Sequence, residues 1–75
     1  MKDLVLKTLR SIRLENNYTQ EYISIELNIS QSYYGRIENG KAVLDIVKLC
    51  KILKILHTDY IDFFSQVKAK EKKYN

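Results

Sequence analysis

The chain has 75 residues and a formal net charge of +4, with 45% hydrophobic and 29% charged residues. A chain of this length forms one domain with a small core, and this composition excludes a disordered or collagen-like chain. The apolar runs fall well short of the ~18 residues that a membrane span requires, so no membrane partner is expected. The positive charge is compatible with a polyanionic partner but does not by itself indicate one.

Chemically reactive motifs are missing from the sequence. Cys50 is the single cysteine, which rules out an intramolecular disulfide and leaves too few ligands for a cysteine-based metal site. No catalytic triad, paired carboxylates or phosphate-binding loop is present, and the first residues lack the apolar run of a signal peptide. We therefore expect a cytoplasmic protein that is not an enzyme and has no catalytic residue, metal, other cofactor or small-molecule ligand.

The absence of proline and the presence of only two glycines favour an all-helical fold. The first predicted helix, residues 2–16, has apolar residues at spacings of three and four, which is typical of a helix with one buried face. These apolar residues are Val5, Leu6, Leu9 and Ile12. Asn16 and Asn17 interrupt the helix because asparagine favours turn and left-handed conformations.

Two short helices are predicted next, over residues 20–27 and 31–39. Thr19 and Ser30 precede them as N-cap residues, whose hydroxyl oxygens accept hydrogen bonds from free backbone N–H groups. Asn28 is expected to end the second helix in a left-handed conformation. Gly40 is expected to supply a positive φ at the exit of the third.

Two further helices complete the predicted fold. Asp45 caps the fourth, which carries a rich apolar face. The residues of this face are Ile46, Leu49, Ile52, Leu53 and Leu56. Thr58 and Asp59 cap the fifth helix, which we expect to end near Val67. The remaining residues have too little apolar material to pack, so we expect a domain over 1–67 and a frayed basic tail over 68–75.

The second and third helices, joined by a short turn, are the minimum of a helix-turn-helix unit. A helical wheel at about 100° per residue turns Tyr34 and Ile37 of the third helix inward. The open face offers groups that can read base edges: glutamine for adenine, arginine for guanine, serine for either, and an aromatic ring for the thymine methyl. The predicted base contacts are Gln31, Ser32, Tyr33 and Arg36. An ordinary solvated helix face is the alternative interpretation.

Three segments stand out in and around these helices: YTQE at 18–21, ISQS at 29–32 and RIENGK at 36–41. Together they resemble the Xre/Cro-type repressors, whose archetypes are the lambdoid phage repressors and Cro. The resemblance covers residues 6–64 and implies a compact five-helix, lambda-repressor-like bundle that binds a double-stranded DNA operator and regulates transcription. Three departures from the family pattern are Ser24 for alanine, Asn28 for glycine, and Tyr34 for isoleucine or valine. The last puts a phenol in the core, where its hydroxyl needs a partner or an exit to solvent.

Phosphate contacts are expected at helix ends and where glycine lets the DNA backbone approach closely. The predicted residues are Thr19, Gln20, Gly35, Asn39 and Lys41. The resemblance supports Gln20, which matches a family position that bonds the DNA backbone. It also implies a partly buried salt bridge between Arg13 and Glu38, which match residues that pair across the first and third helices of several phage repressors. Arg10, one turn earlier, is expected to face solvent or phosphate.

An excess of apolar residues in the fifth helix predicts a homodimer. Tyr60, Ile61 and Phe64 are expected at its interface, because the core has no room for every apolar residue of this helix. The alternative is that the aromatic residues pack on the first helix and that DNA brings two monomers together. The predicted role is that of a repressor or autoregulator of the phage, mobile-element, restriction-modification controller or antitoxin type. A protein-interaction module on the same fold, without DNA binding, is the alternative from another class.

Overall fold

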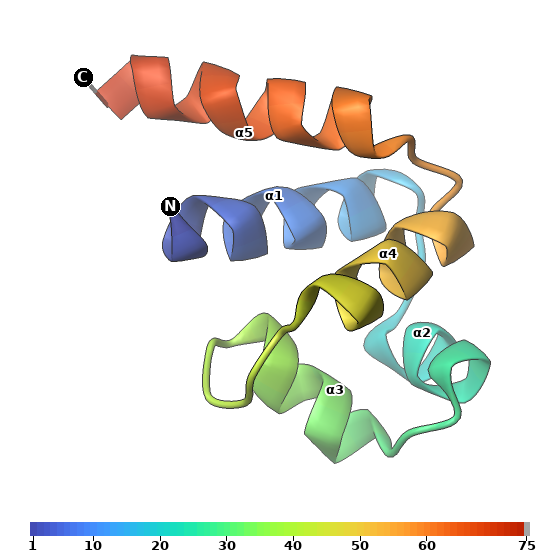
Figure 1. The fold of residues 1–75 in the computed structure, drawn as a ribbon. Coiled ribbons are helices and arrows are strands. Elements are labelled where there is room, and N and C mark those ends of the chain that lie inside the picture. The colour runs from blue at the N-terminus through green and yellow to red at the C-terminus, as the bar shows by residue number, and fades with distance from the viewer. Residues whose placement is uncertain (75) are drawn as a thin grey trace.

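The computed structural model describes residues 1–74, with side chains as far as residue 72. This part of the chain forms five helices and no strand (Figure 1): α1 Lys2–Glu15, α2 Gln20–Leu27, α3 Gln31–Glu38, α4 Ile46–Ile55 and α5 Tyr60–Tyr74. The predicted all-α class with five helices is therefore confirmed. None of the described helices is long and apolar enough to cross a membrane.

Local capping signals fix where most of these helices begin and end. The side chains of Thr19, Ser30 and Asp45 accept hydrogen bonds from backbone N–H groups three residues later, at 3.0, 3.0 and 2.8 Å. Asn28 has a left-handed φ of 59° after α2, and Gly40 has a φ of 78° beyond α3. All five residues take the conformations expected from the sequence, because each signal acts within one helical turn.

One buried cluster draws on all five helices: Leu9, Ile12, Ile23, Tyr34, Leu49, Ile52, Leu53, Leu56, Phe63 and Val67. Ile46, predicted for the apolar face of the fourth helix, is instead 65% exposed. It lines an open hollow of about 490 Å³ between the start of α1 and the segment that leads into α4. The prediction of its burial is wrong because the apolar stripe of a helix is buried only as far as a neighbouring element covers it.

The helix α5 runs antiparallel to α1 along one side of the molecule (Figure 1). Phe63 and Val67 point inward and are 0% and 1% exposed, whereas Tyr60, Ile61 and Phe64 remain exposed. The core therefore takes up part of the apolar material of this helix and leaves the rest on the surface.

The same helix continues to Tyr74, so the prediction that it ends near Val67 is wrong. Residues 68–72 consist of lysine, alanine and glutamate, which have high helix propensities. Extending a helix that is already anchored by its first two turns also avoids the cost of nucleation. Asn75, the last residue of the predicted tail, lies outside the described residues.

The pair α2 and α3 occupies the side of the bundle opposite α5 (Figure 1). The two helices pack on each other, α2 also packs on α4, and α3 packs on α1. Thus α3 is supported from behind while its outer side faces away from the rest of the molecule.

Candidate nucleic-acid interface

The third helix divides into a buried and an open face. Tyr34 and Ile37 are both 0% exposed, as the helical wheel predicts. On the other side, Gln31, Ser32 and Arg36 are exposed, and Tyr33 and Gly35 are partly buried. The polar side chains that could read base edges therefore lie together on the free side of α3.

Gly35 marks the place where α2 crosses α3. A Cβ atom added at this position would lie 3.3 Å from Oε1 of Gln20, the first residue of α2. A larger side chain would therefore press on the Gln20 amide. The role expected for Gly35 toward the DNA backbone stays a prediction, and the close approach in the structure is made by Gln20.

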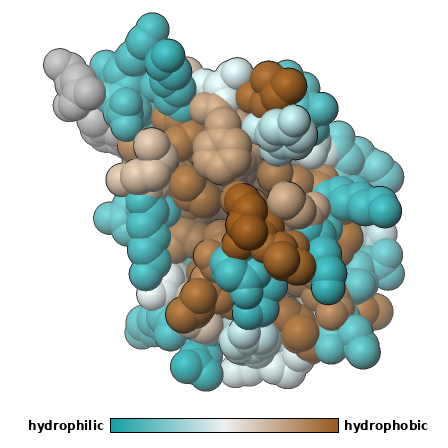
Figure 2. Space-filling model, in the orientation of Figure 1, coloured by the Kyte–Doolittle hydropathy of each residue, from teal (hydrophilic) through white to brown (hydrophobic). Residues whose placement is uncertain are grey.

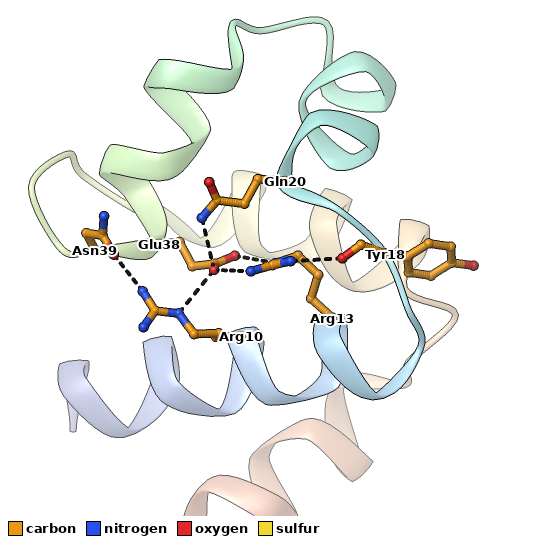
Figure 3. Close-up of polar contacts among 6 residues, drawn as sticks. All are labelled: Arg10, Arg13, Tyr18, Gln20, Glu38 and Asn39. Atoms are coloured by element: carbon orange, nitrogen blue, oxygen red, sulfur yellow. Dashed lines mark hydrogen bonds and ion pairs between the residues drawn. The ribbon is translucent and has the colours of Figure 1, made fainter.

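The last residue of α3, Glu38, is held by Arg13 of α1 in a two-pronged ion pair (Figure 3). Arg13 donates from Nε to Glu38 Oε2 at 2.9 Å and from its terminal nitrogen to Oε1 at 2.8 Å. The other terminal nitrogen donates to the Tyr18 carbonyl at 2.8 Å. The two side chains are 9% and 0% exposed, so this is a buried pair that ties α3 and the segment before α2 to α1.

Hydrogen bonds keep the Glu38 carboxyl charged in this buried setting. Burial alone would raise its pKa, but the hydrogen bonds from Arg13 and Gln20 and the positive charge of Arg13 together hold the pKa below its usual value. The hydrogen bonds that Arg13 donates to Glu38 in turn raise the pKa of the Arg13 guanidinium. Both groups are therefore ionised at neutral pH. Each neutralises the charge of the other, which would be costly to bury alone.

Two further side chains meet at the same carboxylate, and sequence reasoning placed neither of them there. Gln20 Nε2 and Arg10 Nε each donate to Glu38 Oε1 at 3.2 Å. Arg10 also donates to the side-chain oxygen of Asn39 at 2.6 Å. A spacing of three residues puts Arg10 and Arg13 on one face of α1, which is the signal that could have found the second arginine.

The family model described as "Helix-turn-helix" matches residues 9–63, which include all of α2, α3 and α4. The chain belongs to the Xre-type helix-turn-helix family. A relative from Bacillus subtilis (strain 168), named "Uncharacterized HTH-type transcriptional regulator YqaF", is 35% identical over 72 residues, which cover 96% of this chain and 93% of the relative. No solved structure gives a significant match.

Membership of the Xre-type helix-turn-helix family assigns the chain to DNA-binding regulators of transcription and not to enzymes. In such a unit the second helix enters the major groove, and here that helix is α3. Thr19 caps the start of α2, where backbone N–H groups point outward. Asn39 and Lys41 are exposed just after α3. These residues lie at the two ends of the helix-turn-helix unit, before α2 and just after α3.

Two tyrosines of α3 have surroundings that the sequence does not reveal. The Lys48 Nζ of α4 lies 5.8 Å from the centre of the Tyr33 ring and 3.3 Å from Asp45 Oδ2. The ring of Tyr33 is thus in contact with the start of α4.

The Tyr34 hydroxyl is buried without a hydrogen-bond partner of good geometry among the described residues. Burial and the nearby Glu38 carboxylate raise the pKa of Tyr34, which therefore stays neutral.

Proposed function

We propose that this protein is a sequence-specific transcriptional regulator that reads base edges in the major groove with the outer face of α3. The observation that carries the proposal is the division of this helix. Its inner side is buried in the core, while Ser32 and Arg36 are exposed on the outer side and Gln31 is exposed at its flank. In the proposed complex Gln31 binds an adenine edge, Arg36 binds a guanine edge and Ser32 binds either. Tyr33 contacts a thymine methyl from the flank of the same face.

Contacts to the DNA backbone surround this face in the proposed complex. The start of α2, with Thr19 and Gln20, supplies N–H donors to one phosphate group. Asn39 and Lys41 supply an amide and a cation beyond the end of α3. The DNA backbone also approaches the protein at Gly35. Such contacts fix the position of the protein on the duplex without reading its sequence.

The proposed biological role is that of a dimeric repressor or autoregulator of the phage, mobile-element, restriction-modification controller or antitoxin type. A protein-interaction module on the same fold is the alternative. Binding to random duplex DNA at several salt concentrations separates the two. A DNA-binding protein loses affinity steeply as salt rises, because phosphate contacts release condensed counterions. An interaction module would show little affinity at any salt concentration, and that result would contradict the proposal.

Lys41→Ala tests the proposed backbone contacts. We expect it to weaken binding to all duplexes alike and to lower the slope of log affinity against log salt by about one unit, because one phosphate contact is lost. Lys68→Ala is the matched control, since this exposed lysine lies on α5, on the opposite side of the bundle. An unchanged slope for Lys41→Ala, or an equal change in both variants, would count against a contact at Lys41.

We further propose that the protein forms a homodimer through α5. Tyr60, Ile61 and Phe64 are 63%, 62% and 39% exposed, although all three are apolar or aromatic. Figure 2 shows hydrophobic side chains gathered over the middle of the face that α4 presents, and they reach toward α5. A two-fold contact centred on Ile61, Phe64 and the end of α4 would remove this surface from water and set two recognition helices apart.

Phe64→Asp is the test of this dimer. A carboxylate at the centre of an apolar two-fold contact would face its own copy, so we expect the variant to sediment as a monomer and to lose operator affinity. Gln66→Asp adds the same charge at an exposed position about 160° around α5 from Phe64 and should leave the dimer intact. A wild-type protein that is monomeric at micromolar concentration, with Phe64→Asp unchanged in mass and operator affinity, would rule out the proposed interface.

A further inference from the structure

Arg10 joins α1 to the end of α3 through two different hydrogen bonds (Figure 3). Its Nε atom donates to Glu38 Oε1 at 3.2 Å, and a terminal nitrogen donates to Asn39 Oδ1 at 2.6 Å. The Arg10 side chain is 47% exposed, whereas that of Glu38 is 0% exposed. The guanidinium therefore links a buried carboxylate to an amide at the molecular surface.

This contact decides which end of the Asn39 amide faces outward. A guanidinium has only donors, so the group that Asn39 turns toward Arg10 has to be its carbonyl oxygen. The amide nitrogen then lies on the side away from Arg10 (Figure 3). A phosphate oxygen only accepts hydrogen bonds, and the end of Asn39 that is left free is the end that can donate to it.

The charges of the cluster favour an anion at the same place. Arg10 and Arg13 both pair with the single carboxylate of Glu38, so two positive groups oppose one negative group. Glu38 and Arg13 are buried, and Arg10 is the member that reaches the surface. The surplus positive charge therefore lies beside the Asn39 amide.

We propose that Arg10 is a positioning residue for DNA binding, which holds the Asn39 side chain with both N–H donors directed at the DNA backbone. This inference rests on the proposed function, because it takes Asn39 to be a phosphate contact. In the absence of Arg10, the Asn39 amide can turn either end outward and its oxygen would then repel the phosphate.

The orientation of Asn39 can be observed without DNA. In protein labelled with ¹⁵N, the side-chain amide signal of Asn39 is identified by its loss in Asn39→Ala. Arg10→Met keeps the unbranched stem of the arginine but removes its donors, so we expect the Asn39 signal to move toward the position of a free amide. Lys68→Met, on the opposite side of the bundle, should leave the signal unchanged. An Asn39 signal that does not respond to Arg10→Met would overturn the proposal.

A double-mutant cycle tests the consequence for DNA binding. Arg10→Met and Asn39→Ala should each weaken binding to duplex DNA by about tenfold, and the double variant should be no weaker than either one. Losses that multiply to about a hundredfold would mean that Arg10 contacts DNA on its own, and the proposal would be wrong.

Arg10→Lys distinguishes a loss of DNA binding from a simple folding defect. It keeps a cation beside Glu38 and so preserves the fold, but one ammonium cannot hold the carboxylate and the amide as the planar guanidinium does. We expect it to melt like the wild type and to bind DNA as weakly as Arg10→Met, whereas full affinity would overturn the proposal. If the wild type binds no DNA, the proposed function is wrong, and so is the role of Arg10 in DNA binding. The Asn39 signal still reports whether Arg10 orients the amide.

Discussion

Glu38→Ala is expected to lower the free energy of unfolding by about 3–5 kcal/mol, the cost of removing one partner from a buried ion pair. The substitution leaves Arg13, whose side chain is 9% exposed, without a counter-charge. It also removes the acceptor for Arg10 and Gln20. Unfolding by urea, followed by circular dichroism, measures the loss. We expect base preference to be retained under conditions where the variant is still folded.

The control for this experiment is Glu26→Ala, which removes an exposed glutamate from α2 and should change stability by no more than about 0.5 kcal/mol. The dependence on pH gives a second check. Because the pKa of Glu38 is lowered in the folded state, its contribution is present above the unfolded carboxyl pKa of about 4.3 and is lost as the pH falls through the lower folded value. Glu38→Gln should lack this part of the acid destabilisation. A Glu38→Ala variant that unfolds like the wild type would exclude a structural role for the pair.

Arg36→Ala and Gln31→Ala are each expected to weaken specific DNA binding by about 1–3 kcal/mol, with relaxed preference at particular base pairs. Both side chains are exposed on the outer face of α3 and make no contribution to the buried core. Their removal should therefore act on base recognition while the fold is unchanged. Affinities for a selected site and for duplexes with single base-pair substitutions measure the effect.

The affinities for duplexes with single base-pair substitutions show which base each side chain reads. For Arg36→Ala, the penalty for replacing one guanine should disappear, and for Gln31→Ala the same should hold for one adenine. Glu26→Ala, on the outside of α2, serves again as the matched control. A loss of equal size on specific and random DNA would instead make these two residues phosphate contacts and remove them from base reading.

Much of the architecture could be predicted because its signals are local. A cap acts over three residues, and a left-handed residue such as Asn28 ends a helix through its own backbone conformation. The two faces of α3 follow from helical geometry once its start at Ser30 is known. These features need no knowledge of the rest of the chain.

Features that depend on distant segments could not be predicted in the same way. The hydrogen bonds from Arg10 join residues 28 and 29 positions apart, and the approach of Gln20 to Gly35 depends on the angle between two helices. The exposure of Ile46 depends on where its neighbours end. The length of α5 is different, because the high helix propensity of residues 68–72 is visible in the sequence and prevails over their lack of apolar side chains.

Selection of bound sites from random duplex DNA tests most directly whether the outer face of α3 reads DNA sequence. The affinity of the wild-type protein for the selected site is then compared with its affinity for random duplex at physiological salt. We expect one enriched sequence, bound at least about 10³-fold more tightly than random DNA. Selection without an enriched sequence, together with equal affinity for every duplex, would contradict base reading by α3.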